Sequence, residues 1–371
     1  MDFDFSDEQI QLRDAVRKWV ERAYSFEARR AAVRAGGLDR AVYEELARQG
    51  LTALTVPEAH DGMGLGAVDA MVVMEELGRG LVLEPLGQAY VASGILSHQG
   101  EAAAQARWLP KIASGQALVV LAHQERRARW RLDDCQASAR ETAGGWAVSG
   151  TKGVVPGGDR ADAYLVPAMA DGRLALFIVE RTAPGVTATG YLTQDGSRAG
   201  ELHLADAQAT LVSRDGLAAL ELGVDIGIAA ACAEGVGAME ATLALTADYL
   251  NTRKQFGVAI ASFQALRHRM ADMKMQLELA RSMSYYASLK LNAPAEERRQ
   301  AMARAKYQLG QSLRFVGQQS VQLHGGIGVT DEYIGSHFFK KLTQLELTYG
   351  DSLHHLGEVS KRMQETAGVF G

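Results

Sequence analysis

Two short segments hold the residues whose types and spacing could do chemistry: "RKQFG" at 253–257 and "GGIG" at 325–328. Arg253 is a permanent cation whose planar, fork-shaped side chain suits a pyrophosphate. Gly325 and Gly326 let a backbone approach a cofactor without a Cβ in the way. "GGIG" alone is typical of a helix-terminating turn, but together with "RKQFG" it indicates a cofactor site.

Other side chains that could bind a metal are spaced unfavourably. Cys135 and Cys232 are far apart and match no metal-ligand spacing, which favours two reduced thiols in a cytosolic protein. His354 and His355 are adjacent, so they do not share a helix face, and packing or an interface fits them better than a metal pair. We therefore expect no metal site. No GxGxxG opens a βαβ unit and no GxxxxGK[ST] occurs, so neither a Rossmann nor a P-loop mechanism is supported.

The chain has three regions that differ in their hydrophobic and turn patterns, and these regions must position the two segments. They predict domains at 1–116, 117–213 and 214–371. Residues 1–116 are predicted to be helical. Ser6 and Gln9 form a capping-box pattern, and Gly50 is placed like a helix C-cap. From about residue 117, short runs rich in β-branched and aromatic residues alternate with turn signals, which include 171–172 and 195–196. The predicted runs are 116–123, 144–155, 161–169, 173–180 and 185–191. This pattern predicts a small antiparallel β-barrel or sandwich.

After about residue 214 the helical pattern returns. Leu220, Val224 and Ile228 are spaced by four, and two long amphipathic segments follow, which predicts a C-terminal four-helix bundle and an α+β fold overall. The most apolar stretch, "GIAAACAEGVGAMEATLAL", is interrupted by Glu234 and Glu240, so a buried helix explains it better than a membrane span.

Composition and charge narrow the class of protein. The chain is 47% hydrophobic and 22% charged, as in a folded soluble protein. A net charge of −5 argues against a nucleic-acid partner, whose phosphates would require a basic surface. The opening "MDFDFSDEQI" is acidic where a secretory signal is basic, so we expect a cytoplasmic protein without membrane attachment.

Two longer segments carry a family resemblance. "DYLNTRKQFGVAIASFQALRHRMADM" at 248–273 has the pattern YxxxRxQFGxxIxxFQxxxxxxADM, and "QLHGGIGVTDEY" at 322–333 has the pattern QxxGGxGxxxEY. Together they resemble the acyl-CoA dehydrogenase family of FAD-dependent flavoproteins. The loop "VPEAHDGMG" is similar to the N-terminal loop of that family, and the order helices, β-domain, helices fits throughout.

The resemblance implies the cofactor, the substrate and the partners. Arg253 and Gln255, with Phe256 shaping the same pocket, would contact the pyrophosphate and adenosine half of an FAD held by a neighbouring subunit. The QxxGGxG residues would approach the adenosine end of that FAD. These residues are Gln322, Gly325 and Gly326. The family implies a dimer of dimers held through the C-terminal bundle, an acyl-CoA substrate and electron-transfer flavoprotein as the acceptor.

Two features of the family are missing from this chain. The motif similar to TEPGAGSD, on the flavin side of the β-domain, is replaced by "LAHQERRARW" at 121–130. Val154, in "GVVPGG", lies where a flavin-contacting tryptophan is expected. The catalytic glutamate falls on Tyr349, and the alternative base position, on the helix before RxQFG, falls on Gly227. Tyrosine, with a pKa near ~10, is largely protonated at neutral pH and replaces a carboxylate poorly.

Three nearby carboxylates are candidates for a relocated base: Asp351, Glu346 and Glu234. Two or three residues turn a side chain by roughly 200–300° on a helix, so none inherits the geometry of the glutamate. Asp351 also fits as the N-cap of the helix that follows it.

Three hypotheses follow. The first is a subunit that completes the FAD site of a base-bearing partner, most like the small subunit of heteromeric acyl-CoA dehydrogenases of the pimeloyl-CoA type. The second is a self-sufficient dehydrogenase with Asp351 as its base, and the third is a structural subunit without flavin.

Overall fold

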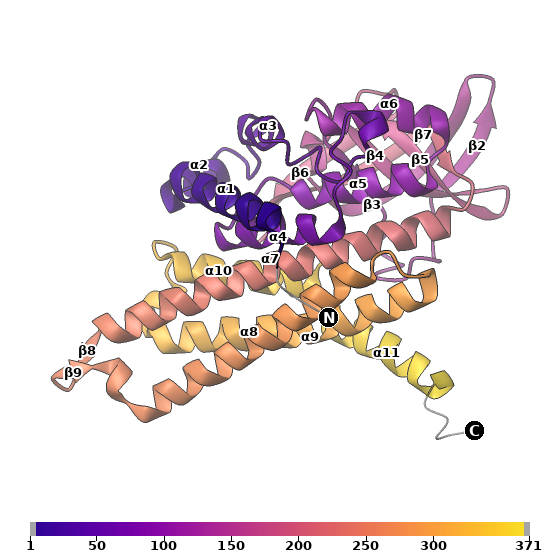
Figure 1. Ribbon diagram of the computed structural model, residues 1–371. Helices are drawn as coiled ribbons and strands as arrows, with labels where there is room; N and C mark the ends of the chain where they lie inside the picture. The colour runs from indigo at the N-terminus through magenta and orange to yellow at the C-terminus, as the bar shows by residue number, and fades with distance from the viewer. Residues whose placement is uncertain (1–4, 367–371) are drawn as a thin grey trace. The chain divides into compact units, whose positions relative to one another are not determined.

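A computed structural model describes residues 5–366 of the chain (Figure 1). The chain forms two compact units. One unit, called the helical unit here, consists of the described residues up to 29, residues 71–82 and those from 228 onward. The other, called the β unit, consists of residues 30–70 and 83–227. The long helix α7 (Gly216–Thr252) continues from one unit into the other.

The predicted helix signals of the N-terminal region are confirmed. Helix α1 (Asp7–Ala23) begins at Ser6, whose Oγ accepts a hydrogen bond from the Gln9 backbone N–H at 3.3 Å. Gln9 Oε1 accepts in return from the Ser6 N–H at 3.1 Å, which completes the capping box. Gly50 has φ +79° directly after α3, a left-handed conformation that glycine adopts without strain. The other elements of this region are α2 (Phe26–Arg34), α3 (Arg40–Arg48), η1 (Glu58–His60), α4 (Ala67–Arg79), α5 (Leu86–Gln99) and α6 (Ala102–Ala113).

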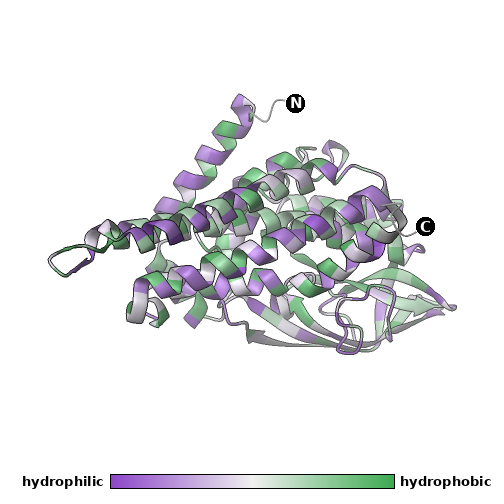
Figure 2. Cartoon of the chain, turned by 90° about the horizontal axis from the view of Figure 1, so that it is seen from below, coloured by the Kyte–Doolittle hydropathy of each residue, from purple (hydrophilic) through white to green (hydrophobic). Residues whose placement is uncertain are grey.

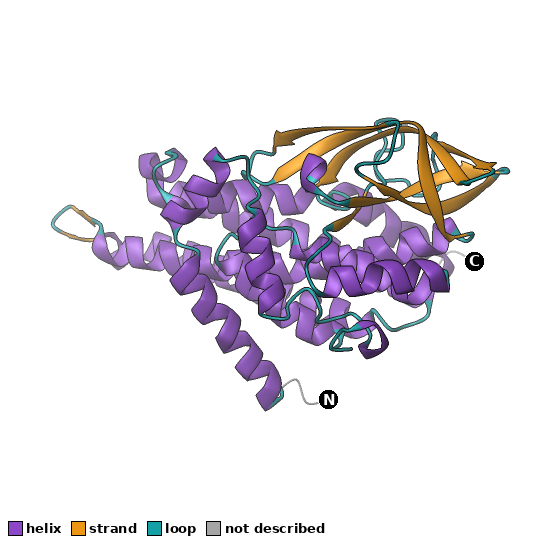
Figure 3. Ribbon diagram, turned by 90° about the horizontal axis from the view of Figure 1, so that it is seen from above, coloured by secondary structure: helices purple, strands orange, loops and turns teal. Residues whose placement is uncertain are grey.

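The β unit contains one seven-stranded sheet, drawn in orange in Figure 3. Its strands are β1 (Val119–Leu121), β2 (Ser138–Thr142), β3 (Gly145–Pro156), β4 (Ala163–Ala170), β5 (Arg173–Glu180), β6 (Val186–Leu192) and β7 (Arg198–Ser213). The order is β1-β4-β2-β3-β7-β5, and β5 returns to β4, so the sheet closes on itself. All pairings are antiparallel except β1–β4 and β2–β4. Buried side chains such as Val148, Tyr164 and Phe177 fill the interior.

The turn predicted at Asp171-Gly172 joins β4 to β5. Both residues have positive φ, +49° and +79°, which matches the twist of the two flanking strands. Strands β2 and β7 were not among the predicted runs. β7 contains "ELHLADAQAT", in which alanine and charged residues dilute the β-branched signal, and its pairing with three other strands stabilises it instead.

The helical unit contains the predicted bundle. Its helices after α7 are α8 (Gln264–Lys290), α9 (Ala295–His324), α10 (Ile334–Leu347) and α11 (Ser352–Thr366). Figure 2 shows hydrophilic and hydrophobic bands alternating along these helices, as the amphipathic pattern requires. Helix α7 is long and apolar enough to cross a membrane, but 72% of its most apolar window is buried in the protein, as in a core helix.

Candidate functional site

The predicted "RKQFG" segment forms a short hairpin at the end of α7. Strands β8 (Lys254–Gln255) and β9 (Val258–Ala259) pair, and the two turn residues between them, Phe256 and Gly257, have φ of +54° and +81°. This is the two-residue turn that tight hairpins favour, although a phenylalanine is unusual at positive φ. The Arg253 backbone closes the base of the hairpin, because its N–H donates to Tyr249 at 2.8 Å and its carbonyl accepts from Ile260 at 2.9 Å.

The side chains of this hairpin face solvent. Arg253 and Gln255 are exposed, and Phe256 is 89% exposed at the tip. Its ring makes an edge-to-face contact with Phe263 at 6.0 Å between centroids. Figure 1 shows the hairpin projecting beyond the end of the bundle. Large exposed aromatic side chains of this kind are typical of surfaces that another molecule covers.

The predicted "GGIG" segment forms a 3-10 turn, η4 (Gly325–Val329), at the end of α9. Gly325 has φ +62° and ends the helix, so its own conformation explains the glycine. Gly326 differs, because a Cβ placed there would have no atom within 4 Å and its φ is not positive. Within residues 5–366, nothing therefore requires glycine at 326. Gln322, one helical turn earlier, is exposed as well.

His324 joins the ends of α7 and α9, and sequence reasoning did not single it out. It is 3% exposed, and its ring lies 4.6 Å from that of Tyr249 and 5.1 Å from that of Tyr333. Burial lowers its pKa, and Nδ1 donates to the Ser320 carbonyl at 2.8 Å. Because Tyr249 is one helical turn before Arg253, this contact fixes the glycine turn close to the base of the hairpin.

Tyr349, at the position of the family glutamate, lies in the loop between α10 and α11. It has φ +59°, and Gly350 follows at +112°. A fully buried lysine, Lys306 on α9, holds this loop by donating to the carbonyls of Glu346 at 2.8 Å and Gly350 at 2.9 Å. Burial lowers the pKa of Lys306 to about 8. In the sequence, Lys306 is a charge on the otherwise apolar face of α9, which marks the position but not the carbonyls that it binds.

The three candidate carboxylates each have a structural partner. Asp351 Oδ1 accepts from the His354 N–H at 2.8 Å, which is the N-cap geometry predicted for the start of α11. Glu346 is 8% exposed, and Oε1 accepts from the N–H and the hydroxyl of Ser352 at 3.0 and 2.7 Å. Glu234 pairs with Lys341 at 2.5 Å. Of the three, Asp351 is held by a backbone N–H alone, whereas Glu346 accepts two hydrogen bonds and Glu234 pairs with a lysine.

The histidines after Tyr349 pack against this loop. The His355 Nε2 donates to the Tyr349 carbonyl at 3.0 Å, and burial, with the charge of Lys306, lowers its pKa to about 3. The ring of His354 meets that of His355 edge to face at 4.9 Å. Within residues 5–366, no group of histidine, cysteine, aspartate and glutamate side chains is arranged to hold a metal ion.

In the β unit, the segment that replaces the flavin-side motif folds around a buried ion pair. Lys152 on β3 is 0% exposed, and its Nζ donates to Glu125 Oε1 at 2.6 Å. The same carboxylate accepts from the backbone N–H groups of Gln136 at 2.7 Å and Ala137 at 3.1 Å. Burial opposes its charge, but the hydrogen bond and charge of Lys152 outweigh burial, so the pKa of Glu125 is lowered. The carboxylate of Glu125 thus takes the hydrogen bonds of Lys152 and of two backbone N–H groups of loop 122–137.

Val154, where a flavin-contacting tryptophan was expected, lies in a bulge of β3. The pairing register with β7 shifts between Lys152 and Val155, and Val154 has φ +50° with its side chain 49% exposed. A β-branched residue is strained in this left-handed conformation.

Comparisons with known proteins identify the family. The family models for the acyl-CoA dehydrogenase N-terminal and C-terminal domains match residues 6–116 and 214–364. The acyl-CoA dehydrogenase IpdE2 of Mycolicibacterium smegmatis is 31% identical over 340 residues, which cover 91% of this chain and 92% of that protein. This chain belongs to the acyl-CoA dehydrogenase family of oxidoreductases, whose members use FAD.

Two solved structures are similar over almost the whole chain. A variant of the steroid ACAD Tcur3481-Tcur3483 is 29% identical with a TM-score of 0.90, covering 98% of this chain and 99% of that one. A chain of the ChsE4-ChsE5 complex of Mycobacterium tuberculosis is 26% identical with a TM-score of 0.89, covering 99% and 100%. The fold predicted from the sequence, an acyl-CoA dehydrogenase-like arrangement of helices, β-barrel and helical bundle, is confirmed.

Proposed function

We propose that this chain is one subunit of an FAD-dependent acyl-CoA dehydrogenase and that it completes the FAD site of a partner subunit carrying the catalytic base. The reaction is desaturation of an acyl-CoA between Cα and Cβ. One observation carries the proposal: the residues suited to a neighbour's FAD are exposed, while the base position holds Tyr349.

The hairpin and the glycine turn fit the cofactor. Arg253 offers an exposed, permanent cation for the pyrophosphate, and Gln255 and Phe256 shape the same pocket. Gln322, Gly325 and Gly326 form the approach to the adenosine end. The open space at Gly326 supports this assignment, because a backbone that must come close to a cofactor has no room for a Cβ. When bound, FAD supplies the acceptor for the hydride that leaves the β-carbon.

The flavin-side loop of this chain does not fit a flavin ring of its own. The carboxylate of Glu125 takes the hydrogen bonds of Lys152 and two backbone N–H groups, so these donors are already used within the loop. The partner subunit therefore supplies the pocket of the isoalloxazine ring. No step of the reaction is assigned to loop 122–137.

The partner subunit also supplies the base. A positioned carboxylate that takes the α-proton contributes typically ~10²–10⁴-fold to such a rate. Glu346 and Glu234 are engaged in a hydrogen-bonded loop and an ion pair, so neither is free to take that proton. Asp351, which accepts from one backbone N–H, is the remaining candidate in this chain, and it is the base in a second hypothesis in which the chain works alone.

The similar complexes support a heteromeric assembly. ChsE4-ChsE5 is a complex, and the steroid ACAD Tcur3481-Tcur3483 is likewise named for two components. The same proposal includes a dimer of dimers with a second family member, reoxidation by electron-transfer flavoprotein and a cytoplasmic location. Cys135 and Cys232 are both free thiols, which fits a reducing compartment.

The first test measures flavin per chain. The protein is expressed alone and together with a family member that has a glutamate at the position of Tyr349, and the visible spectrum is recorded for both. A colourless chain that becomes part of a yellow complex is the expected result. An Arg253→Ala variant should lower the FAD content of the complex, whereas Arg304→Ala, an exposed arginine on α9, should leave it unchanged.

The second test separates the hypotheses by activity. The complex should desaturate acyl-CoA, and the chain alone should not. If the chain alone turns over at ordinary enzyme rates of about 1–10³ s⁻¹ and loses this activity in Asp351→Asn, the proposed role is wrong and the self-sufficient enzyme is right. A complex that forms without FAD would establish the structural subunit instead.

A further inference from the structure

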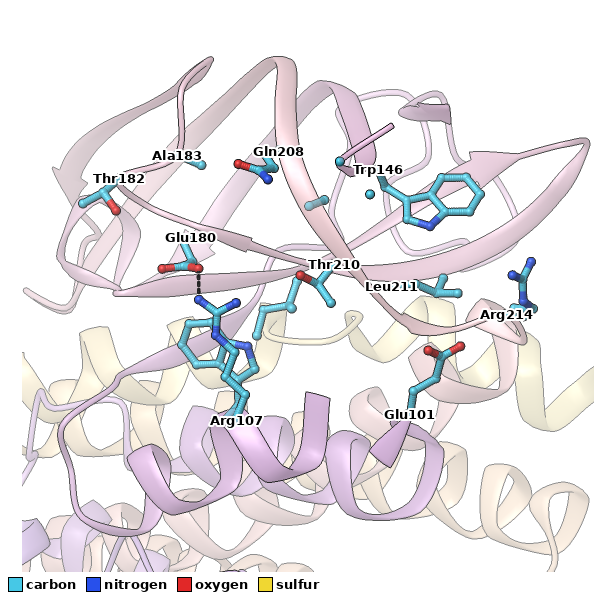
Figure 4. Close-up of a pocket in the computed structure, with 15 residues that line it drawn as sticks. Glu101, Arg107, Trp146, Glu180, Thr182, Ala183, Gln208, Thr210, Leu211 and Arg214 are labelled. Atoms are coloured by element: carbon cyan, nitrogen blue, oxygen red, sulfur yellow. Dashed lines mark hydrogen bonds and ion pairs between the residues drawn. The ribbon is translucent and has the colours of Figure 1, made fainter. Parts of the chain in front are cut away.

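A polar cleft of about 710 Å³ lies wholly within the β unit, away from every residue assigned above (Figure 4). Helix α6 forms one wall, and the outer face of β5 and β7 forms the floor. The turn at Gly144–Gly145 and the loop at 182–183 border it. The volume is within the range of ~300–1,000 Å³ that small-molecule sites occupy.

Each end of the cleft carries one carboxylate and one guanidinium. Figure 4 shows Arg107 and Glu180 at one end, joined by a hydrogen bond, and Glu101 and Arg214 at the other. In residues 5–366, neither the carboxylate of Glu101 nor the guanidinium of Arg214 takes part in a hydrogen bond or ion pair. One end is thus neutralised within the protein, while the other offers both charges to a ligand.

The backbone keeps these two charges near each other. The Glu101 N–H donates to the carbonyl of Val212 at 2.8 Å, which ties the start of α6 to the end of β7. Arg214 follows two residues after that carbonyl. Both side chains are exposed, so a ligand can reach them without displacing protein atoms.

The rest of the lining favours a polar ligand over an aromatic one. Gln208 and Thr210 point outward from β7 and supply an amide and a hydroxyl. Trp108 is 4% exposed, and Trp146 is 8% exposed with its ring packed against Phe177 at 5.1 Å. Neither indole presents a face on which a nucleobase could stack.

We propose that this cleft binds a zwitterion, an amino acid or short peptide with a free amino group and a free carboxylate. The ammonium pairs with Glu101 and the carboxylate with Arg214, since charge-assisted hydrogen bonds are the strongest polar contacts available there. Gln208 and Thr210 bind the neutral part of the ligand. The inference is independent of the FAD-site proposal, because it uses no residue of the helical unit.

The probe is triglycine in four forms, measured by isothermal titration calorimetry with the full chain. The forms are free-ended, N-acetylated, C-amidated and capped at both ends, so that they differ only in charge. The free-ended peptide should bind, and removal of either charge should weaken binding at least about tenfold, as loss of one hydrogen bond to a charged group predicts. If the N-acetylated peptide binds equally well, the cleft is a plain anion site and the proposal is wrong.

Variants test the two residues directly. Glu101→Gln and Arg214→Gln should each weaken binding of free-ended triglycine about tenfold, while Arg173→Gln, an exposed arginine outside the cleft, should not. The charge-exchanged variant with Glu101→Arg and Arg214→Glu should regain binding with the peptide reversed. Binding that is unaffected by either glutamine variant, or no binding of any form, overturns the inference. All three side chains are exposed, so the variants keep the fold.

Discussion

Replacing Lys152 with methionine should destabilise the β unit by about 3 kcal/mol, because the change leaves a carboxylate buried without its cation. The side chain of Lys152 is 0% exposed and that of Glu125 is 6% exposed. Breaking such a pair costs about 3–5 kcal/mol. Glu125 keeps its hydrogen bonds from Gln136 and Ala137, so the cost should lie at the low end of that range. Urea unfolding followed by circular dichroism measures it.

A matched pair on the surface provides the control. Lys274 and Glu278 on α8 are also 2.6 Å apart, but their side chains are 59% and 47% exposed. Lys274→Met should therefore cost only about 0.3–0.5 kcal/mol. Equal losses in the two lysine variants would refute the reasoning, since burial is the difference on which it depends.

The pH dependence gives a second check. The pKa of Glu125 is lowered in the folded protein, so the ion pair stabilises the fold above the unfolded pKa and this stability is lost as pH falls through the folded value. In Lys152→Met the carboxylate stays buried and its pKa rises. The difference between the two proteins should be largest near neutral pH, and it should shrink as the pH falls through the raised pKa of the variant and then the lowered pKa of the parent. A difference that grows on acidification would contradict the assignment.

Three further outcomes are expected. Val154→Gly should raise the free energy of unfolding by about 1 kcal/mol, because glycine relieves the strain of the positive φ. Val155→Gly, at a buried extended position, should lower it, and thermal melts compare the stability of the two variants. Asp351→Ala should cost about 1 kcal/mol of stability, and Asp351→Asn should cost much less, because asparagine also caps a helix. Equal losses of stability in the two variants would exclude the N-cap role. Burial, with Arg281 opposing it, raises the pKa of Glu75 to about 7. The folded state therefore holds its proton up to that pH, and the stability of the parent falls as the pH rises from the unfolded pKa to 7. Glu75→Gln should be more stable than the parent at pH 8 and nearly as stable at pH 5, and urea midpoints at both pH values test this.

Local signals in the sequence predicted the helices and most strands. The capping box at Ser6 and Gln9 and the turn at Asp171-Gly172 are decided by neighbours in the chain, and both are confirmed. β7 was missed, because a strand of this composition is stable only through its partners. The same holds for the parallel pairing of β1 with β4, which depends on residues more than 40 positions apart.

The residues of the candidate site also differ in how far the sequence alone indicates them. Motif residues such as Arg253 and Gly326 could be singled out as candidate cofactor contacts, since their types and spacing are visible in the sequence, and that role stays a prediction. Lys306 and the pair of Lys152 with Glu125 could not, because a buried charge is recognised only when its partner is known. The sequence left two interpretations of Asp351 open, and its hydrogen bond to His354 was needed to show the cap. Its proposed role as a base stays a prediction.

Gly326 has a consequence for how this protein evolves. The methyl group of an alanine there would have no atom of the described chain within 4 Å, so packing within the described fold exerts no selection against the substitution. Any constraint on this position must then come from another molecule that approaches it. A lineage that lost that molecule should accumulate side chains at 326 within a fold that is otherwise unchanged, and Gly325, which its own φ requires, should persist in the same sequences.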